Sequence, residues 1–236
     1  NGLVLAEDGN GKKMSKSKNN YPSPKDFIDK YGADSLRPYL INSPVVRAES
    51  LRFRSSGVYY VVKYVFLPWY NAYRFFVQYA KRLEVEGLAS FSPMEQAVLL
   101  KSASVLDQTE SLVSFVRQEM DAYRLYTAVL YLVKYIDYLT YIYVRLNRRR
   151  FKGRTGDEDC RVSLSTLYHV LVTTCVVMAP FTPSFTEVFY QNLWKCQVNL
   201  RRAFTFASSL PQLAREMMVV RPDKEFLEDI TGKLEE

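Results

Sequence analysis

The chain of 236 residues is poor in glycine, cysteine and histidine. Its 9 glycines are few for a sheet-rich, turn-rich fold, so the composition favours helices. The three cysteines, Cys160, Cys175 and Cys196, lie far apart and without metal-ligand spacing, which predicts free thiols in a reducing compartment and no bound metal. The single histidine, His169, excludes a histidine-pair catalytic motif within the chain, and its apolar neighbours predict a core position.

The sequence also lacks an apolar run of the roughly 20 residues that a membrane span requires. The longest run, near residues 170–181, is too short, and polar side chains interrupt the aromatic stretch at residues 59–79. The first residues show no signal peptide pattern. We therefore expect a cytoplasmic protein without a membrane partner.

Positive charge and aromatic side chains are abundant instead. The net charge is +7, and the chain contains 18 tyrosines and 14 phenylalanines. This basic excess fits a polyanionic partner such as nucleic acid, although ordinary basic proteins share it. With 48% hydrophobic residues, the chain can bury a core.

The first 55 residues carry mixed local patterns. Residues 3–6 predict a strand, and Ser23 is placed to cap a helix that ends at Gly32. Asp34 is expected to cap a second helix, so that Pro38 falls near its first turn, where proline is tolerated. These elements predict a small α/β segment.

From about residue 57 the pattern becomes helical. Helices are predicted at residues 57–80 (with a kink at Pro68), 92–120, 125–146, 163–178 and 184–194. Two apolar stripes with alternating spacings of three and four mark buried faces. They comprise Tyr59, Val62, Phe66, Trp69, Tyr73, Phe76 and Ala80, followed by Leu125, Val129, Leu132, Ile136, Leu139, Tyr143 and Leu146. The predicted fold is mainly α, an antiparallel helix bundle preceded by the α/β segment.

One short motif stands out on the polar loop before Ser23. Lys13-Met14-Ser15-Lys16-Ser17 is a five-residue match to the signature loop of class I aminoacyl-tRNA synthetases, and a solvated basic loop is the plainer alternative. The sequence that follows, through residue 53, resembles the isoleucyl branch of that family. The likeness continues in the segments at residues 66–75, 143–150 and 178–183 and thins after about residue 195.

The resemblance implies a role for each residue of the loop. ATP, with Mg²⁺, would be a substrate, and the whole loop from Lys13 to Ser17 would contact it. Lys13 and Lys16 would be catalytic, with Lys16 the main contributor, because lysines can meet the negative charge that builds on the phosphate oxygens. Ser15 and Ser17 would supply hydroxyls and a compliant backbone.

The resemblance also implies a division of the chain and a partner. Residues 1–55 would be the end of a catalytic domain with a stem-contact segment, residues 56–205 an anticodon-binding domain, and residues 206–236 the start of a C-terminal junction region. The tRNA contacts are expected on exposed faces, opposite the two apolar stripes. The candidate residues are Asn71, Arg74, Arg145, Arg148, Arg149 and Lys152. A solvated helix face is the plainer alternative, and Trp69 and Tyr73 are expected in the core.

The implied activity is that of an isoleucine-tRNA ligase, which uses ATP, isoleucine and tRNA(Ile). The family's His-Ile-Gly-His type signature is absent, so the chain is expected to be the C-terminal part of such an enzyme and inactive alone. The valyl branch, a free-standing RNA-binding module and a helical scaffold are alternatives. Association with other synthetases is left open.

Overall fold

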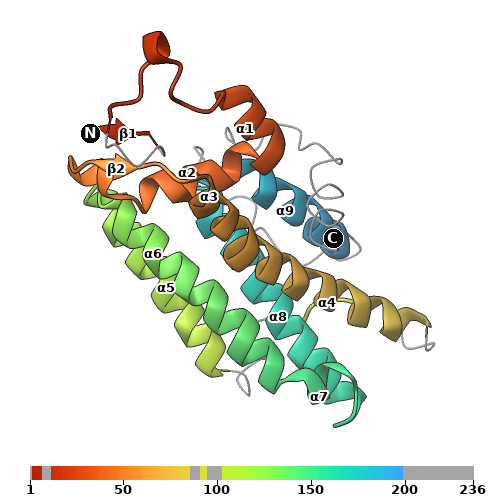
Figure 1. The fold of residues 1–236 in the computed structure, drawn as a ribbon. Helices are drawn as coiled ribbons and strands as arrows, with labels where there is room; N and C mark the ends of the chain where they lie inside the picture. Colours follow the sequence, from red (N-terminus) through yellow and green to blue (C-terminus); the bar gives the residue numbers. More distant parts are fainter. Residues whose placement is uncertain (1, 7–11, 86–90, 95–102, 199–236) are drawn as a thin grey trace.

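A computed structural model describes residues 2–6, 12–85, 91–94 and 103–198 of the chain. Figure 1 shows long helices packed beneath a smaller N-terminal part. The elements are β1 (Val4–Leu5), α1 (Pro24–Tyr31), α2 (Ala33–Ile41), β2 (Leu51–Arg52), α3 (Ser55–Val61), α4 (Leu67–Val85), α5 (Ala103–Asp121), α6 (Leu125–Asp137), α7 (Arg148–Phe151), α8 (Asp157–Met178) and α9 (Pro183–Val198). The prediction of a mainly helical chain with a small strand-containing segment is confirmed.

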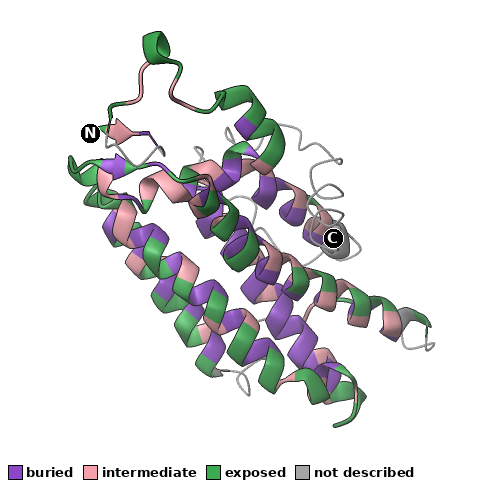
Figure 2. Cartoon of the chain, viewed as in Figure 1, coloured by how far each residue is buried: buried purple, intermediate pink, exposed green. Residues whose placement is uncertain are grey.

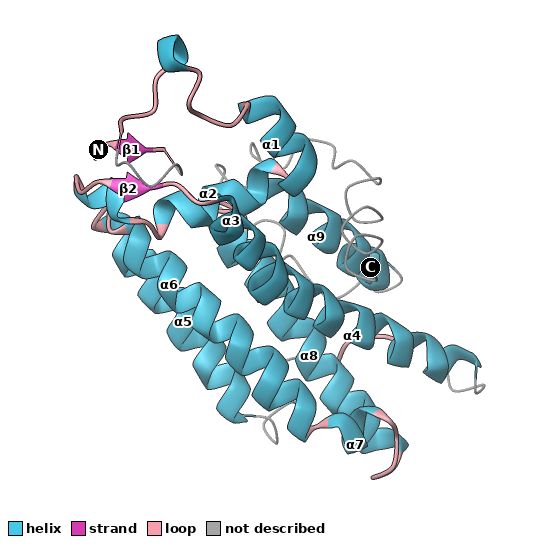
Figure 3. Cartoon of the chain, viewed as in Figure 1, coloured by secondary structure: helices cyan, strands magenta, loops and turns pink. Residues whose placement is uncertain are grey.

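The N-terminal part combines a two-stranded sheet with two short helices (Figure 3). β1 pairs in parallel with β2, with Val4 opposite Leu51. The sequence predicted the first strand but not its partner. Ser23 caps α1 as predicted, because its Oγ accepts a hydrogen bond of 3.4 Å from the Asp26 N–H, and the helix ends at Gly32 with a φ of 78°.

The prediction that Asp34 caps its own helix is wrong. α2 begins at Ala33, and its N-cap is Gly32. Asp34 lies inside the helix and is buried, and its Oδ2 accepts a hydrogen bond of 2.6 Å from the backbone N–H of Phe185 in the first turn of α9. Asp34 therefore caps a helix 151 residues away, and Pro38 lies in the interior of α2.

A second contact ties α2 to the same place. The guanidinium of Arg37 donates to the carbonyl oxygens of Phe181 at 3.0 Å and Pro180 at 2.8 Å, which lie between α8 and α9. Carbonyls near a helix C-terminus carry partial negative charge and favour a cation. The N-terminal part is thus joined to the helical part through both charged side chains of α2.

Replacing Asp34 tests this connection. Asp34→Ala should lower the free energy of unfolding by about 1–2 kcal/mol, because it leaves the Phe185 N–H without an acceptor inside the protein. Asp34→Asn keeps an acceptor oxygen and should cost less. Urea denaturation of the variants at neutral pH measures both changes, and equal losses for alanine and asparagine would contradict the capping role.

The pH dependence of the same pair has a defined sign. Burial raises the pKa of Asp34 above its ordinary value of 3.8, outweighing the hydrogen bond from Phe185. A raised pKa in the folded state stabilises the protein below 3.8 and loses that effect as the pH rises through the raised value. The stability of the wild type relative to Asp34→Asn should therefore fall across this window.

The core of the helical part is strongly aromatic. Trp69 and Phe66 are fully buried against α9, with ring centroids 5.4 Å and 4.6 Å from that of Phe185. Tyr73 stacks on Phe189 at 4.5 Å, so Trp69 and Tyr73 pack in the core as predicted. Figure 2 shows buried residues concentrated on the inward faces of α4, α6 and α8.

Most residues of the two apolar stripes are buried, but Tyr59, Leu125 and Leu146 are 39%, 38% and 76% exposed. Two π-helical segments, Val62–Phe66 and Tyr138–Val144, explain why Tyr59 and Leu146, at the ends of the predicted stripes, are not buried. A π-helical turn accommodates one extra residue, which rotates everything beyond it on the helical wheel. Val58 is accordingly buried in place of Tyr59. Leu125 is the first residue of α6.

Two predicted helix starts also change. α8 begins at Asp157 and not near residue 163. The acidic residues of its first turn stabilise the helix N-terminus electrostatically. The apolar periodicity did not reveal this start, because that turn is polar. Residues 92–94 are not helical, residues 95–102 lie outside the described part, and α5 begins at Ala103. The predicted helices at 125–146 and 184–194 correspond to α6 with its π-helical extension and to α9.

α8 forms the centre of the helical part. Its length and composition would suffice for a membrane span, but 67% of its apolar window is buried in the fold, which is typical of a core helix. Cys160 and Cys175 on α8 are buried free thiols. The side chain of Cys196 lies outside the described part. His169 packs as predicted, with Nε2 2.8 Å from the Met94 carbonyl oxygen, and burial lowers its pKa.

Candidate functional site

The loop that carries the lysine motif starts from a fixed base. The chain returns from residues 7–11, which lie outside the described part, and runs antiparallel to β1. The Ala6 N–H donates to the Lys12 carbonyl at 2.9 Å, and the Met14 N–H donates to the Val4 carbonyl at 3.1 Å. Lys13 is thus held at the edge of the sheet, on the side of β1 that does not pair with β2.

Met14 anchors the loop to the body of the protein. Its half-buried side chain packs against a small cluster formed by Phe27, Phe53 and Val58. The lysines on either side, Lys13 and Lys16, are exposed. The motif therefore places one apolar anchor between two cations that point away from the core.

Asn20 closes the loop, which the sequence did not predict. Its Oδ1 accepts from the Ser15 N–H at 2.8 Å, while its Nδ2 donates to the Lys13 carbonyl at 3.2 Å. Asparagine commonly bonds to nearby backbone in turns, so its presence just after the motif was the available signal. The Asn20 amide thus joins the end of the loop to its start at Lys13 and Ser15, and Lys16 lies between these two points.

The tip of the loop is a single turn of 3₁₀-helix, Lys16–Lys18. Asn19 ends it in the left-handed conformation, with φ 45° and ψ 37°, which asparagine tolerates better than most residues. The hydroxyls of Ser15 and Ser17 lie 2.8 Å apart at its start. The loop is chemically able to bring ammonium groups and hydroxyls to an anion.

A second group of cations lies at the far end of the helical part, around α7 (Figure 1). We call this group the basic corner. Its members are Arg145, Arg148, Arg149, Lys152 and Arg154, and all five are exposed. The first four were predicted from the sequence as an arc on one continuous helix. The helix instead ends and restarts at Asn147, so the four residues do not lie on one continuous helix, although they remain neighbours in the chain.

A tight turn shapes the basic corner. Gly153 has a φ of 67°, its N–H donates to the Arg150 carbonyl at 2.9 Å, and the Arg154 N–H donates to the Arg149 carbonyl at 3.1 Å. These two bonds form a Schellman motif, the usual end of a helix at glycine. The turn brings Arg154, which sequence reasoning missed, back beside the arginines of α7.

The remaining predicted residues, Asn71 and Arg74, lie on α4 and are exposed. They are separate from the basic corner. It is Arg82, in the last turn of α4, that reaches the corner, where it donates to the Lys152 carbonyl. At 1.5 Å per residue, Arg74 lies about 12 Å back along the helix. Among the residues that the structure describes, no group of three or more His, Cys, Asp or Glu side chains is placed to hold a metal.

Comparison with known proteins covers both regions. A family model described as the anticodon-binding domain of tRNA ligase matches residues 103–235, and one for class I tRNA synthetases (I, L, M and V) matches residues 1–52. Cytoplasmic isoleucine–tRNA ligase from Arabidopsis thaliana is 54% identical over 100% of this chain and 23% of its own length. The enzyme of the same name from Mus musculus is 56% identical over 82% of this chain and 16% of its own.

A solved structure agrees in fold. The LeuRS chain in a ternary complex with tRNA and LeuAMS, from Agrobacterium radiobacter, superimposes with a TM-score of 0.51 at 17% identity. The superposition covers 92% of this chain and 24% of that one. The chain described here therefore spans about a fifth of the length of the curated relatives it matches.

Proposed function

Because the chain belongs to the family of anticodon-binding domains of tRNA ligases, we propose that it is part of an isoleucine–tRNA ligase. The complete enzyme would activate isoleucine with ATP and transfer it to tRNA(Ile) in the cytoplasm, the compartment in the names of several relatives. The observation that carries the proposal is the lysine loop, held by Met14 and Asn20 at the edge of a sheet, in a chain 54% identical to a named ligase.

The loop would act on ATP bound by the rest of the enzyme. Attack of the amino-acid carboxylate on the α-phosphate expels pyrophosphate, and negative charge builds on the phosphate oxygens. The exposed ammonium groups of Lys13 and Lys16 would stabilise that charge, with Lys16 the main contributor. Ser15 and Ser17 would offer hydroxyl donors, and Met14 would keep the loop attached while its tip meets the phosphates. Mg²⁺ would arrive with ATP.

The helical part would hold the tRNA. We place the end of the catalytic domain and its stem-contact segment at residues 1–55, the anticodon-binding domain at 56–205 and the start of a junction region at 206–236, the last of these outside the described part. An antiparallel order of the bundle helices is supported by the short connection at residues 122–124 between α5 and α6, which pack together. Arg145, Arg148, Arg149 and Lys152 would contact RNA phosphates, and Asn71 and Arg74 would add contacts along α4.

Isoleucine-dependent exchange between ATP and pyrophosphate in the full-length protein tests the proposal. Isoleucine should sustain exchange, and valine, which lacks one methylene, should support it less well. Faster exchange with valine would make the protein a valine enzyme. No exchange with either amino acid, together with retained tRNA binding, would instead favour a non-catalytic RNA-binding module.

A further inference from the structure

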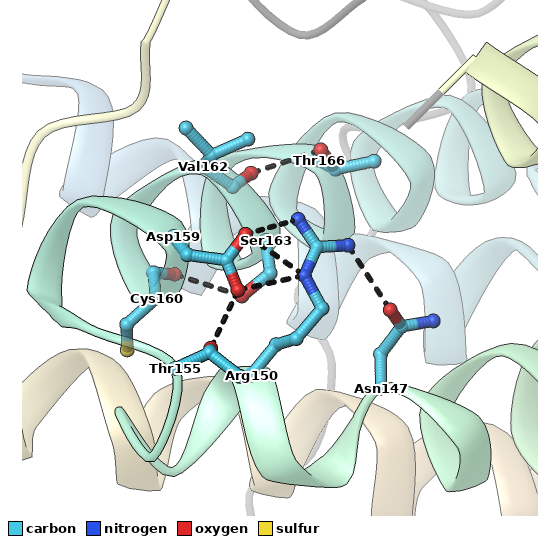
Figure 4. A network of polar contacts seen from close by, with 8 residues as sticks. All are labelled: Asn147, Arg150, Thr155, Asp159, Cys160, Val162, Ser163 and Thr166. Atoms are coloured by element: carbon cyan, nitrogen blue, oxygen red, sulfur yellow. Dashed lines mark hydrogen bonds and ion pairs between the residues drawn. The ribbon is translucent and has the colours of Figure 1, made fainter. Parts of the chain in front are cut away.

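One arginine of the α7 segment is turned inward, away from the basic corner. Figure 4 shows the Arg150 guanidinium lying between the carboxylate of Asp159 on α8 and the amide of Asn147. Arg150 Nε and Nη2 donate to Asp159 at 3.0 Å and 2.8 Å, and Nη1 donates to the Asn147 Oδ1 at 3.1 Å. The two-pronged contact with the carboxylate is the strong, orientation-specific form of this ion pair.

The partners of Arg150 extend the network on both sides. Thr155, in the loop after α7, donates its hydroxyl to Asp159 Oδ2 at 2.6 Å. Asn147 donates its Nδ2 to the Tyr143 carbonyl at 2.9 Å, at the end of the preceding helix. Asp159 thus bonds to side chains before and after the turn at Gly153. The turn that carries Arg148, Arg149 and Arg154 is held at both ends from α8.

The exposed cations need such support because nothing in their own charges would keep them together. Five like charges repel one another, and long side chains on a short, four-residue helix lose freedom when they bind. An ion pair about a quarter to a third exposed adds little to overall stability. Its geometry, in contrast, fixes the direction in which α7 leaves the preceding helix.

We propose that the Arg150–Asp159 ion pair is a positioning element that holds the basic corner in the conformation that binds RNA phosphates, with Arg154 as an additional phosphate contact. This inference rests on the proposed function and extends it to residues that do not themselves touch RNA. The direction in which RNA affinity changes when Asp159 is neutralised distinguishes this role from an effect of net charge. Removal of the Asp159 charge makes the protein more positive, so charge alone predicts tighter binding to RNA, whereas loss of positioning predicts weaker binding.

The test measures the affinity of the full-length protein for a tRNA(Ile) transcript. Asp159→Asn should weaken binding by roughly three- to thirtyfold. Arg150→Lys, which keeps the charge but loses the fork, should weaken it similarly. The matched control is Asp157→Asn, an exposed residue in the same first turn of α8, since no hydrogen bond or ion pair joins Asp157 to Arg150 in the described part of the chain. It removes the same charge and should leave binding unchanged or tighter.

Isoleucine-dependent ATP–pyrophosphate exchange at the wild-type rate establishes that each variant is folded. Binding by Asp159→Asn that equals or exceeds that of the wild type would overturn the positioning role. So would an equal loss in Asp157→Asn. If the wild type itself fails to bind tRNA, the proposed function is wrong, and the inference fails with it.

Discussion

Lys16→Ala in the full-length protein is expected to slow isoleucine-dependent ATP–pyrophosphate exchange by about 10²–10³-fold and to leave the affinity for tRNA nearly unchanged. The reason is that Lys16 is exposed at the tip of a loop whose base is fixed by Met14 and Asn20. An ammonium group there gains its interaction only when charge develops on the phosphates, so its loss should lower kcat more than it raises KM for ATP.

The same loop supplies a control. Lys18 ends the 3₁₀ turn and is also exposed, but it lies outside the five-residue motif. Lys18→Ala removes the same charge and should change the exchange rate by much less than Lys16→Ala. An unchanged rate in Lys16→Ala would disprove the assigned role, and equal losses in both variants would show that the net charge of the loop matters and not the position of one lysine.

Reversal of charge at Arg145, Arg148 and Arg149 by substitution with glutamate is expected to have the second largest effect. The affinity for tRNA should fall by about 100-fold or more at low salt, since three cations that we propose to contact phosphates become anions. The slope of log affinity against log salt should also decrease, by roughly one for each phosphate contact that is lost. Titrations at several salt concentrations measure both quantities, whereas amino-acid activation, which needs no tRNA, should continue.

A second triple variant with the same change in net charge shows whether tRNA affinity depends on the position of the cations or only on their number. Lys63, Arg117 and Lys134 are exposed on the π-helical segment Val62–Phe66, α5 and α6. Their replacement by glutamate changes the net charge by the same amount and should cost much less affinity. Wild-type binding by the triple variant of the basic corner would mean that this surface is not where tRNA binds.

The long helices were predictable because burial of one face imposes a strong periodicity. Val129, Leu132 and Ile136 were placed correctly for that reason. The π-helical segments were not, since an extra residue in one turn leaves no local mark in the sequence while it rotates all later positions. Asp34 shows a second limit, because the rule that places a cap beside its own helix cannot detect a competing helix terminus 151 residues away.

The candidate site likewise has features that the sequence predicted and features that it did not. A contiguous motif identified the lysines of the loop, but the bond from Asn20 back to Ser15 depends on how the turn closes. Charge clustering identified Arg145, Arg148 and Arg149, all exposed as expected. The inward orientation of Arg150 could not be predicted, because it depends on α8 beginning as early as Asp157. That early start places Asp159 within hydrogen-bonding distance of Arg150. Sequence patterns thus indicated which residues carry charge, and tertiary contacts determine what each one faces.

The joining of α2 to the α8–α9 connection has a consequence for the order of events during synthesis. At about 5–20 residues per second, the 151 residues between Asp34 and Phe185 take on the order of ten to thirty seconds to translate. Throughout this interval the carboxylate of Asp34 and the guanidinium of Arg37 have no partner to dock on. The segment that carries α2 is therefore made before α9 but gains this connection only after the ribosome has passed α9.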